Sequence, residues 1–219
     1  MSDAIAAIKD WVIRGKKNEA VAATREALEA GVDPGAIMKD GLIAAMSVVG
    51  ERYSSGEFFL PQMMIAARAM TEVVPVLKPH LIGEAAETKG KAVIGTVQGD
   101  FHDIGKNIVR MMLEGAGYEV VDLGVDVTAD MFIESIRREA PQFMLMSALI
   151  TLTMEGMRRT IQAVNDAGLR SSVCIGVGGA PLTHKYAAEI GADFYSEDAY
   201  ECVQACNRLV ESKRAETRQ

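Results

Sequence analysis

The chain has 219 residues, a formal net charge of −7 and a pI near 5.1; 49% of its residues are hydrophobic and 24% are charged. Its acidity disfavours a nucleic-acid partner, and no apolar run is long enough to span a membrane. The N-terminus lacks a signal-peptide pattern, so we expect a cytoplasmic protein. The cysteines Cys174, Cys202 and Cys206 have no disulfide framework spacing, which predicts reduced thiols. Cys202 and Cys206 lie one helical turn apart, which suits a metal site, a redox pair or simply a half-buried helix face.

Residues 1–82 show only helical periodicity. Their apolar spacing predicts one helix around Ile5 to Val12 and further helices over 18–31, over 33–53 and from Pro61 toward Pro75. Short connections predict a four-helix bundle. The last two helices are rich in methionine, which we interpret as core packing rather than a ligand-facing surface.

Residues 83–90 are polar and bounded by glycine, so we interpret them as a linker to a second domain over 91–219. Beyond the linker, strand and helix patterns alternate. The predicted strands cover 91–97, 118–124, 142–149, 171–179 and 192–196, and the predicted helices cover 104–117, 128–140, 154–168, 184–191 and 197–214. This order predicts an α/β fold with a doubly wound five-stranded parallel sheet. Such sheets bind ligands at the carboxyl ends of their strands, in this chain after Val97, Leu149 and Val177.

The loop after Val97 reads "GDFHDIGKN" and fits no common ligand motif. A phosphate-binding loop is excluded because Asp100 replaces a required glycine and Asn107 replaces the hydroxyl residue. The loop after Val177 lacks the third glycine of a dinucleotide fingerprint, where Pro181 stands. The three histidines do not cluster as zinc ligands, and Ser147 has no nucleophile elbow.

Asp100 and His102 form an Asp-x-His pair in this loop. Asp100 can accept the imidazole N–H, which fixes the tautomer and leaves the other ring nitrogen free to bind a metal. One protein ligand is enough only if a cofactor supplies the other ligands, as a tetrapyrrole does. Taken alone, the pair is also compatible with a purely structural hydrogen bond, and Asp103 with a helix cap.

Three motifs together resemble the signature of cobalamin-binding domains: D-x-H-x-x-G at 100–105, S-x-L at 147–149 and G-G at 178–179. With the N-terminal bundle, the chain is similar over nearly its whole length to the cobalamin-binding module of methionine synthase. It is similar also to the free-standing corrinoid proteins for methanol, methylamines, betaines or methoxylated aromatics. The resemblance implies a helical cap domain over 1–82 and a Rossmann-like, flavodoxin-like domain over 91–219.

The resemblance implies a role for each matching residue. His102 becomes the lower axial ligand of cobalt in place of the dimethylbenzimidazole base, and Asp100 orients it. Thr153, where relatives often have serine, supplies the hydroxyl that completes a hydrogen-bonded ligand relay with His102 and Asp100. The cofactor is implied to be cobalamin, as methylcobalamin or a related corrinoid. Tyr53, Leu60 and Met63 are implied to shield the methyl group. Further cofactor contacts are implied for Gly99, Phe101, Asp103, Ile104, Gly105, Ser147, Leu149, Thr151, Gly178, Gly179 and Ala199.

The function implied by the same resemblance is methyl carriage. The protein would take a methyl group from a substrate-specific methyltransferase and deliver it to an acceptor methyltransferase that uses tetrahydrofolate or a thiol. A reductive activation protein would reduce the cofactor when its cobalt has become inactive. The alternatives are a cobalamin-dependent sensor, the cofactor subunit of an adenosylcobalamin mutase, and an interaction scaffold that has lost its cofactor.

Overall fold

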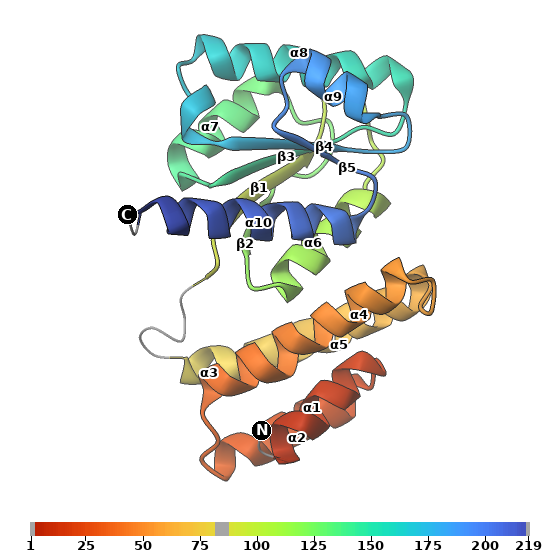
Figure 1. The fold of residues 1–219 in the computed structure, drawn as a ribbon, viewed down its shortest axis with the longest axis vertical. Helices are drawn as coiled ribbons and strands as arrows, with labels where there is room; N and C mark the ends of the chain where they lie inside the picture. Colours follow the sequence, from red (N-terminus) through yellow and green to blue (C-terminus); the bar gives the residue numbers. More distant parts are fainter. Residues whose placement is uncertain (1–2, 82–87, 218–219) are drawn as a thin grey trace. The chain divides into compact units, whose positions relative to one another are not determined.

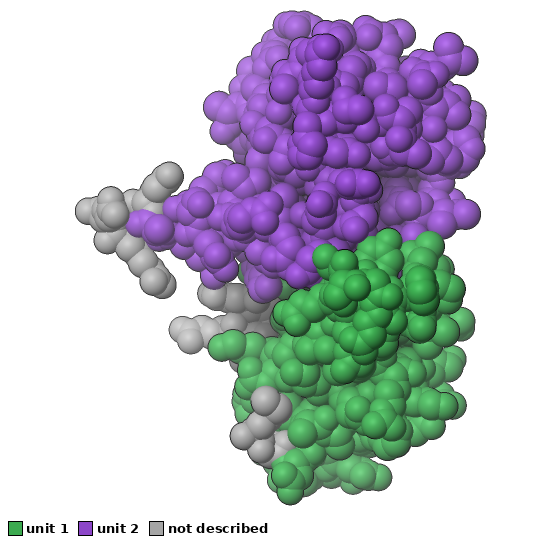
Figure 2. All heavy atoms as spheres, turned by 45° about the vertical axis from the view of Figure 1, so that its right-hand side comes forward, with its two compact units in different colours: residues 1–88, 114–117 green, residues 89–113, 118–219 purple. Residues whose placement is uncertain are grey.

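The computed structural model describes residues 3–81 and 88–217, which fall into two compact units (Figure 1). The helical unit comprises residues 1–88 with 114–117, and the sheet unit comprises 89–113 with 118–219 (Figure 2). Most of the predicted linker, residues 83–87, lies outside the described residues. No helix in the described ranges is long and apolar enough to cross a membrane.

The helical unit is built on amphipathic helices that bury one face each. Ile8, Val12, Leu42, Val49 and Val73 are fully buried in its core, as their helical spacing predicts. Its elements are α1 (Asp3–Ile13), α2 (Lys17–Glu29), α3 (Pro34–Ala36), η1 (Ile37–Ile43), α4 (Ala44–Ser54), α5 (Leu60–Leu77) and η2 (Lys78–His80).

The third predicted helix differs from the expected continuous α-helix over 33–53. It begins as expected, because the Asp33 side chain accepts a hydrogen bond of 2.7 Å from the backbone N–H of Ala36. Residues Ile37–Ile43 then form a π-helix before α4 begins. Such a segment is short, and its apolar spacing resembles that of an α-helix, so the sequence does not reveal it.

The sheet unit contains a five-stranded, all-parallel sheet in the order β2-β1-β3-β4-β5. This confirms the predicted doubly wound fold, since the strand order reverses direction next to β1. The elements are β1 (Lys91–Thr96), α6 (Ile104–Gly115), β2 (Glu119–Asp122), α7 (Ala129–Glu139), β3 (Phe143–Ser147), α8 (Thr151–Asp166), η4 (Arg170–Ser172), β4 (Cys174–Gly178), α9 (His184–Ile190), β5 (Phe194–Ser196) and α10 (Ala199–Thr217).

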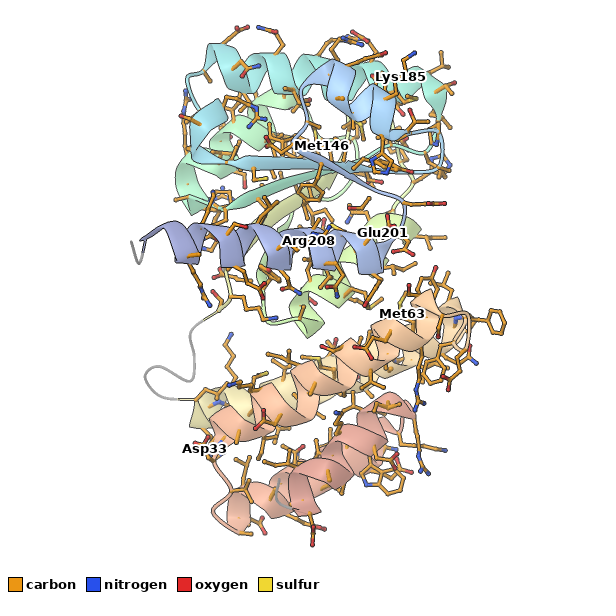
Figure 3. The ribbon with its side chains drawn as sticks, in the orientation of Figure 1. Asp33, Met63, Met146, Lys185, Glu201 and Arg208 are labelled. Carbon is orange, nitrogen blue, oxygen red and sulfur yellow. The ribbon has the colours of Figure 1, made fainter. Side chains whose placement is uncertain are left out.

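Helices cover both faces of this sheet. Helices α7, α8 and α9 lie on one face, and α6 and α10 lie on the other (Figure 1). Val93, Met144 and Ile175 point toward the first layer, where they pack in one apolar cluster with Phe132 and Met157. Met146 belongs to the same cluster and is labelled in Figure 3. Burial on both sides explains why the strands are apolar runs without alternation.

The sheet order places the functional loops at the switch point between β1 and β3. The crossovers from these neighbouring strands leave on opposite faces, which opens a crevice at their carboxyl ends. Helix α8 begins at Thr151, whereas the sequence predicted a start at Met154. The threonines lower helix propensity and obscured this start. Thr151 and Thr153 therefore lie in the first turn of α8.

Candidate functional site

The loop between β1 and α6 carries Asp100 and His102 at the carboxyl end of the sheet. The backbone N–H of Asp100 donates to the carbonyl of Val97 over 3.1 Å, which closes a tight turn. Gly99 lies in this turn with φ +83°, a conformation that suits glycine. The buried hydroxyl of Thr96 donates to the carbonyl of His102 over 2.9 Å. The end of β1 therefore holds both ends of the loop.

The carboxylate of Asp100 is the centre of the site. Its Oδ1 accepts from His102 Nδ1 at 2.7 Å and from the backbone N–H of His102 at 3.0 Å. Its Oδ2 accepts from the backbone N–H of Leu149 at 2.7 Å and from Thr153 Oγ1 at 2.8 Å. Asp100 is only 1% exposed, so these four contacts satisfy a charge that is removed from water.

Asp100 remains ionised, and this fixes the histidine. Burial alone would raise the pKa of Asp100, but the hydrogen bonds from Leu149, His102 and Thr153 outweigh it and hold the pKa well below its ordinary value. A carboxylate can only accept hydrogen bonds, so the proton of a neutral imidazole lies on Nδ1. The lone pair is then on Nε2, and the His102 side chain is 54% exposed. The site presents one oriented nitrogen ligand.

The loop after β2 braces the histidine loop from a third strand. The backbone N–H of Gly99 donates to Asp126 Oδ1 at 2.7 Å, and the backbone N–H of Asp126 donates to the carbonyl of Asp100 at 3.0 Å. Asp126 has φ +55°, in the left-handed region, which aspartate tolerates better than most residues. These two reciprocal contacts were not predicted from the sequence.

Lys106 forms a buried ion pair with Asp122. It is 3% exposed, and its Nζ lies 2.6 Å and 2.7 Å from the two carboxylate oxygens of Asp122. The pair ties the start of α6 to the end of β2, and Asp122 Oδ1 also accepts from the backbone N–H of Gly124 at 2.9 Å. The ammonium of Lys106 is thus engaged by a carboxylate of the protein itself.

Large apolar side chains are exposed on both sides of His102. Phe101 and Ile104 are 69% and 71% exposed, and Leu149 is 44% exposed. Ile150 and Leu152 extend this apolar surface on the loop after β3 and the start of α8. Residues of this kind are mostly buried, and a contiguous exposed group of them marks a binding surface. A flat apolar ligand above the histidine would cover them.

The glycines of the three motifs differ in their surroundings. A Cβ on Gly179 would overlap the carbonyl oxygen of Ala148, and Gly179 has φ +134°, so the fold itself requires glycine there. A Cβ on Gly178 would lie 3.2 Å from the carbonyl oxygen of Ser196, whereas a Cβ on Gly105 would meet nothing within 4 Å. No steric feature of the protein itself requires glycine at 105, which fits the implied close approach of a ligand.

The remaining predicted residues lie in two places. Gly99, Phe101 and Asp103 lie in the loop before α6, Ser147 and Gly178 end β3 and β4, and Ala199 begins α10 after β5. The structure thus brings the motif residues to one edge of the sheet. Tyr53, Leu60 and Met63 belong to the helical unit, where Tyr53 lies on α4 and the other two lie on α5.

Other candidate metal ligands do not form a site. In the described parts of the chain no three His, Cys, Asp or Glu side chains are grouped to hold an ion. Cys174, Cys202 and Cys206 are free thiols, and the latter two are buried. The hydrogen bond with Cys202, with burial, raises the pKa of Cys206, and burial raises the pKa of Cys174 to about 12. The raised pKa values disfavour the reactive thiolate form of Cys174 and Cys206.

Comparisons with known proteins agree with this geometry. Residues 90–204 match the B12 binding domain, and residues 4–78 match a second domain with the same description. Trimethylamine corrinoid protein 1 of Methanosarcina acetivorans is 42% identical over 201 residues, which are 91% of this chain and 93% of that protein. Dimethylamine corrinoid protein 2 of Methanosarcina mazei is 43% identical over 204 residues, 93% of this chain and 95% of that protein.

Solved structures show the same similarity. The methanol:cobalamin methyltransferase complex MtaBC from Methanosarcina barkeri matches with a TM-score of 0.87 and 31% identity over 96% of this chain and 80% of that chain. A cobalamin-binding protein from Desulfitobacterium hafniense matches with a TM-score of 0.77 and 31% identity over 93% of this chain and 97% of that chain. The chain belongs to the B12-binding family and is a cobalamin-binding corrinoid protein of the methyltransferase-system type.

Proposed function

We propose that this chain carries a methyl group on a cobalamin whose cobalt is bound from below by His102. The observation that carries the proposal is the pairing of an exposed imidazole with a buried, ionised Asp100 at 2.7 Å. Bound cobalamin supplies a cobalt that can accept a methyl group and release it. The protein supplies the axial nitrogen, its orientation and a place for the proton.

The residues around Asp100 tune His102 as a ligand. Leu149 and Thr153 hold Oδ2, so Oδ1 stays directed at His102 Nδ1. A fixed carboxylate sets the tautomer of the imidazole and limits its rotation. His102, Asp100 and Thr153 would together hold the cofactor's metal ligand in place, and their hydrogen bonds link the imidazole to the hydroxyl through the carboxylate.

The surroundings of His102 fit a corrinoid. The exposed surface of Phe101, Ile104 and Leu149 offers apolar contact to the lower face of a macrocycle. Ser147, Thr151, Gly178, Gly179 and Ala199 are proposed to contact the displaced nucleotide tail, with Gly99, Asp103 and Gly105 contacting the cofactor near the histidine. Gly105 has free space where a side chain would stand, as a passing ligand requires.

The helical unit is proposed to shield the methyl group. Leu60 is exposed at the start of α5, and Phe59 beside it is 67% exposed. Such apolar groups suit contact with a methyl group on the upper side of a corrin. Tyr53 and Met63 are included by resemblance, and Met63 is buried. Delivery of the methyl group then requires this shield to move aside.

We infer that the methyl donor is a methylamine. Curated relatives named for trimethylamine and dimethylamine are 42% and 43% identical to this chain, whereas the methanol complex is 31% identical. The proposed partners are a methylamine-specific methyltransferase, an acceptor methyltransferase that uses a thiol or tetrahydrofolate, and a reductive activation protein.

Reconstitution tests the proposal. The purified chain is loaded with hydroxocobalamin, reduced without oxygen, and mixed with a trimethylamine, dimethylamine or methanol methyltransferase and its substrate. The visible spectrum should show methylation of cobalt with a methylamine system and not with methanol. His102→Ala should be methylated more slowly. If no donor system methylates the bound cofactor, the carrier function is wrong and the mutase or sensor alternatives take its place.

A further inference from the structure

The last residues of four strands form one row at the carboxyl edge of the sheet. The parallel register pairs Thr96 with Ser147, Ser147 with Gly178, and Gly178 with Ser196. Paired residues of neighbouring parallel strands point to the same face of a sheet. We call Thr96, Ser147, Gly178 and Ser196 the terminal row.

The terminal row faces the α6 and α10 layer. Two residues earlier on the neighbouring strands, a Cβ on Gly176 would contact the Phe194 ring and would lie 2.8 Å from Leu145 Cδ2, so these residues share a face. The alternate positions Met144, Ile175 and Val177 pack in the cluster that contains Phe132 and Met157 of α7 and α8. Because side chains alternate along a strand, the terminal row points the other way.

Ser196 carries a buried hydroxyl that the described protein leaves without a hydrogen bond. The residue is 6% exposed, and its Oγ is buried with no partner among the described residues. Such a group costs free energy, so folded proteins rarely retain one without a ligand or another reason. Thr96, in the same row, differs because its hydroxyl donates to the carbonyl of His102.

Gly178 lies directly beside Ser196 in the terminal row. A Cβ on Gly178 would stand 3.2 Å from the Ser196 carbonyl oxygen, and Gly178 is already proposed to contact the nucleotide tail. Ser147 lies on the other side of Gly178 in the same row. The unpaired hydroxyl thus lies next to two proposed tail contacts, on the same face and at the same depth of the sheet.

We propose that Ser196 Oγ hydrogen-bonds a polar atom of the corrinoid's lower nucleotide, and so selects complete corrinoids over those without this tail. The inference rests on the proposed function, because it takes the tail to lie along the terminal row. It adds a residue that the sequence motifs do not contain. The ligand completes the hydrogen bonding that the protein alone leaves unfinished.

Ser196→Ala separates this role from a structural one, because removal of an unpaired buried hydroxyl should not destabilise the protein without cofactor. Its melting temperature should stay equal or rise. Affinity for hydroxocobalamin should fall about three- to tenfold, the size of one lost hydrogen bond. Affinity for cobinamide, which has the corrin ring but no nucleotide, should not change.

Ser135→Ala is the matched control. Ser135 is 1% exposed, and its Oγ is also buried without a partner in the described structure, but it lies on α7, which covers the opposite face of the sheet. This variant should leave both affinities unchanged. Ser196→Val is a second test: it adds bulk beside Gly178 and should weaken cobalamin binding further while sparing cobinamide.

Either of two results with Ser196→Ala would overturn the proposal: an unchanged cobalamin affinity, or an equal loss of affinity for cobalamin and cobinamide. A wild type that binds both corrinoids equally would also overturn it, because the tail would then contribute nothing. Failure of the histidine ligation is detected separately, since His102→Ala would then leave the visible spectrum unchanged whatever Ser196 does.

Discussion

Thr153 Oγ1 lies 2.8 Å from Asp100 Oδ2, and this contact joins the first turn of α8 to the loop after β1. The same hydroxyl lies 2.9 Å from the carbonyl of Ile150. Its single proton has two acceptors within reach, and the charged carboxylate is the stronger. Thr153 thus connects the two strands at the switch point through the group that orients His102.

Thr153→Val tests this connection, because it keeps the shape of the side chain and removes the hydroxyl. Asp100 Oδ2 then keeps only the Leu149 N–H, so the free energy of unfolding should fall by about 1 kcal/mol. The loaded protein should show a smaller fraction of histidine-ligated cobalt in its visible spectrum. Thr153→Ser should restore both. A valine variant with the wild-type spectrum would show that Thr153 has no part in the ligand relay.

Asp126 can be tested with three substitutions that separate its backbone conformation from its side chain. Asp126→Asn keeps an acceptor for the Gly99 N–H and tolerates the left-handed φ, so it should resemble wild type. Asp126→Gly loses the acceptor and should cost about 1 kcal/mol of unfolding free energy. Asp126→Ala loses the acceptor and also tolerates the left-handed φ poorly, so it should cost about 2 kcal/mol of unfolding free energy. Urea denaturation measures the order, and equal effects of all three would contradict the bracing role.

Lys106 and Asp122 should make stability depend on pH. Burial opposes ionisation of Asp122, but the hydrogen bonds from Lys106 and Gly124 outweigh it and lower its pKa in the folded state. The stabilisation is therefore complete above the ordinary carboxyl pKa of about 3.9 and is lost as the pH falls toward the lowered value. Asp122→Asn should cost about 3 kcal/mol at neutral pH and flatten the acid dependence.

The control for that pair removes both charges. Lys106→Met with Asp122→Leu leaves no buried unpaired ammonium, so it should cost less than Asp122→Asn alone in the same denaturation experiment. If the double variant is the less stable one, the pair contributes by its charges and not by packing.

Gly179 and Gly105 should respond to alanine in opposite ways. Gly179 has φ +134°, and a Cβ at this position would overlap the carbonyl oxygen of Ala148. Gly179→Ala should therefore destabilise the protein without cofactor by more than about 2 kcal/mol. Gly105→Ala meets no atom within 4 Å and lies in α6, so it should leave that form as stable or up to about 1 kcal/mol more stable. Its cobalamin affinity should nevertheless fall. Unchanged affinity in Gly105→Ala would mean that no ligand passes there.

Much of the sheet unit could be predicted because its signals are local. Apolar runs bounded by glycine gave five parallel strands, and the strand ends located Asp100, Ser147 and Gly178 at one edge. The interaction of Asp100 with His102 was also predictable, since only Phe101 separates them in the sequence. The start of α8 was predicted three residues late, because threonine has low helix propensity in isolation and is accepted here through its contacts with Asp100 and Ile150.

The contacts that could not be predicted come from tertiary structure. Leu149 was expected only as a cofactor contact, but its backbone N–H also holds Asp100, and backbone groups leave no trace in residue identity. The left-handed Asp126 and the unpaired Ser196 hydroxyl depend on the register of distant strands. The π-helix at Ile37–Ile43 likewise leaves no signal in the sequence, because its apolar spacing resembles that of an α-helix.

The most direct test of the account is the electron paramagnetic resonance spectrum of the bound cofactor in its cobalt(II) form, in protein labelled with 15N-histidine. The unpaired electron of cobalt(II) occupies an orbital that is directed at the axial ligand. Coupling to the nuclear spin of the axial nitrogen therefore splits each line of the spectrum. Ligation by His102 predicts a doublet in the labelled protein and a triplet in the unlabelled protein, with neither in His102→Ala. A triplet that persists in the labelled protein would show that the cofactor's own base binds cobalt, and would contradict the account.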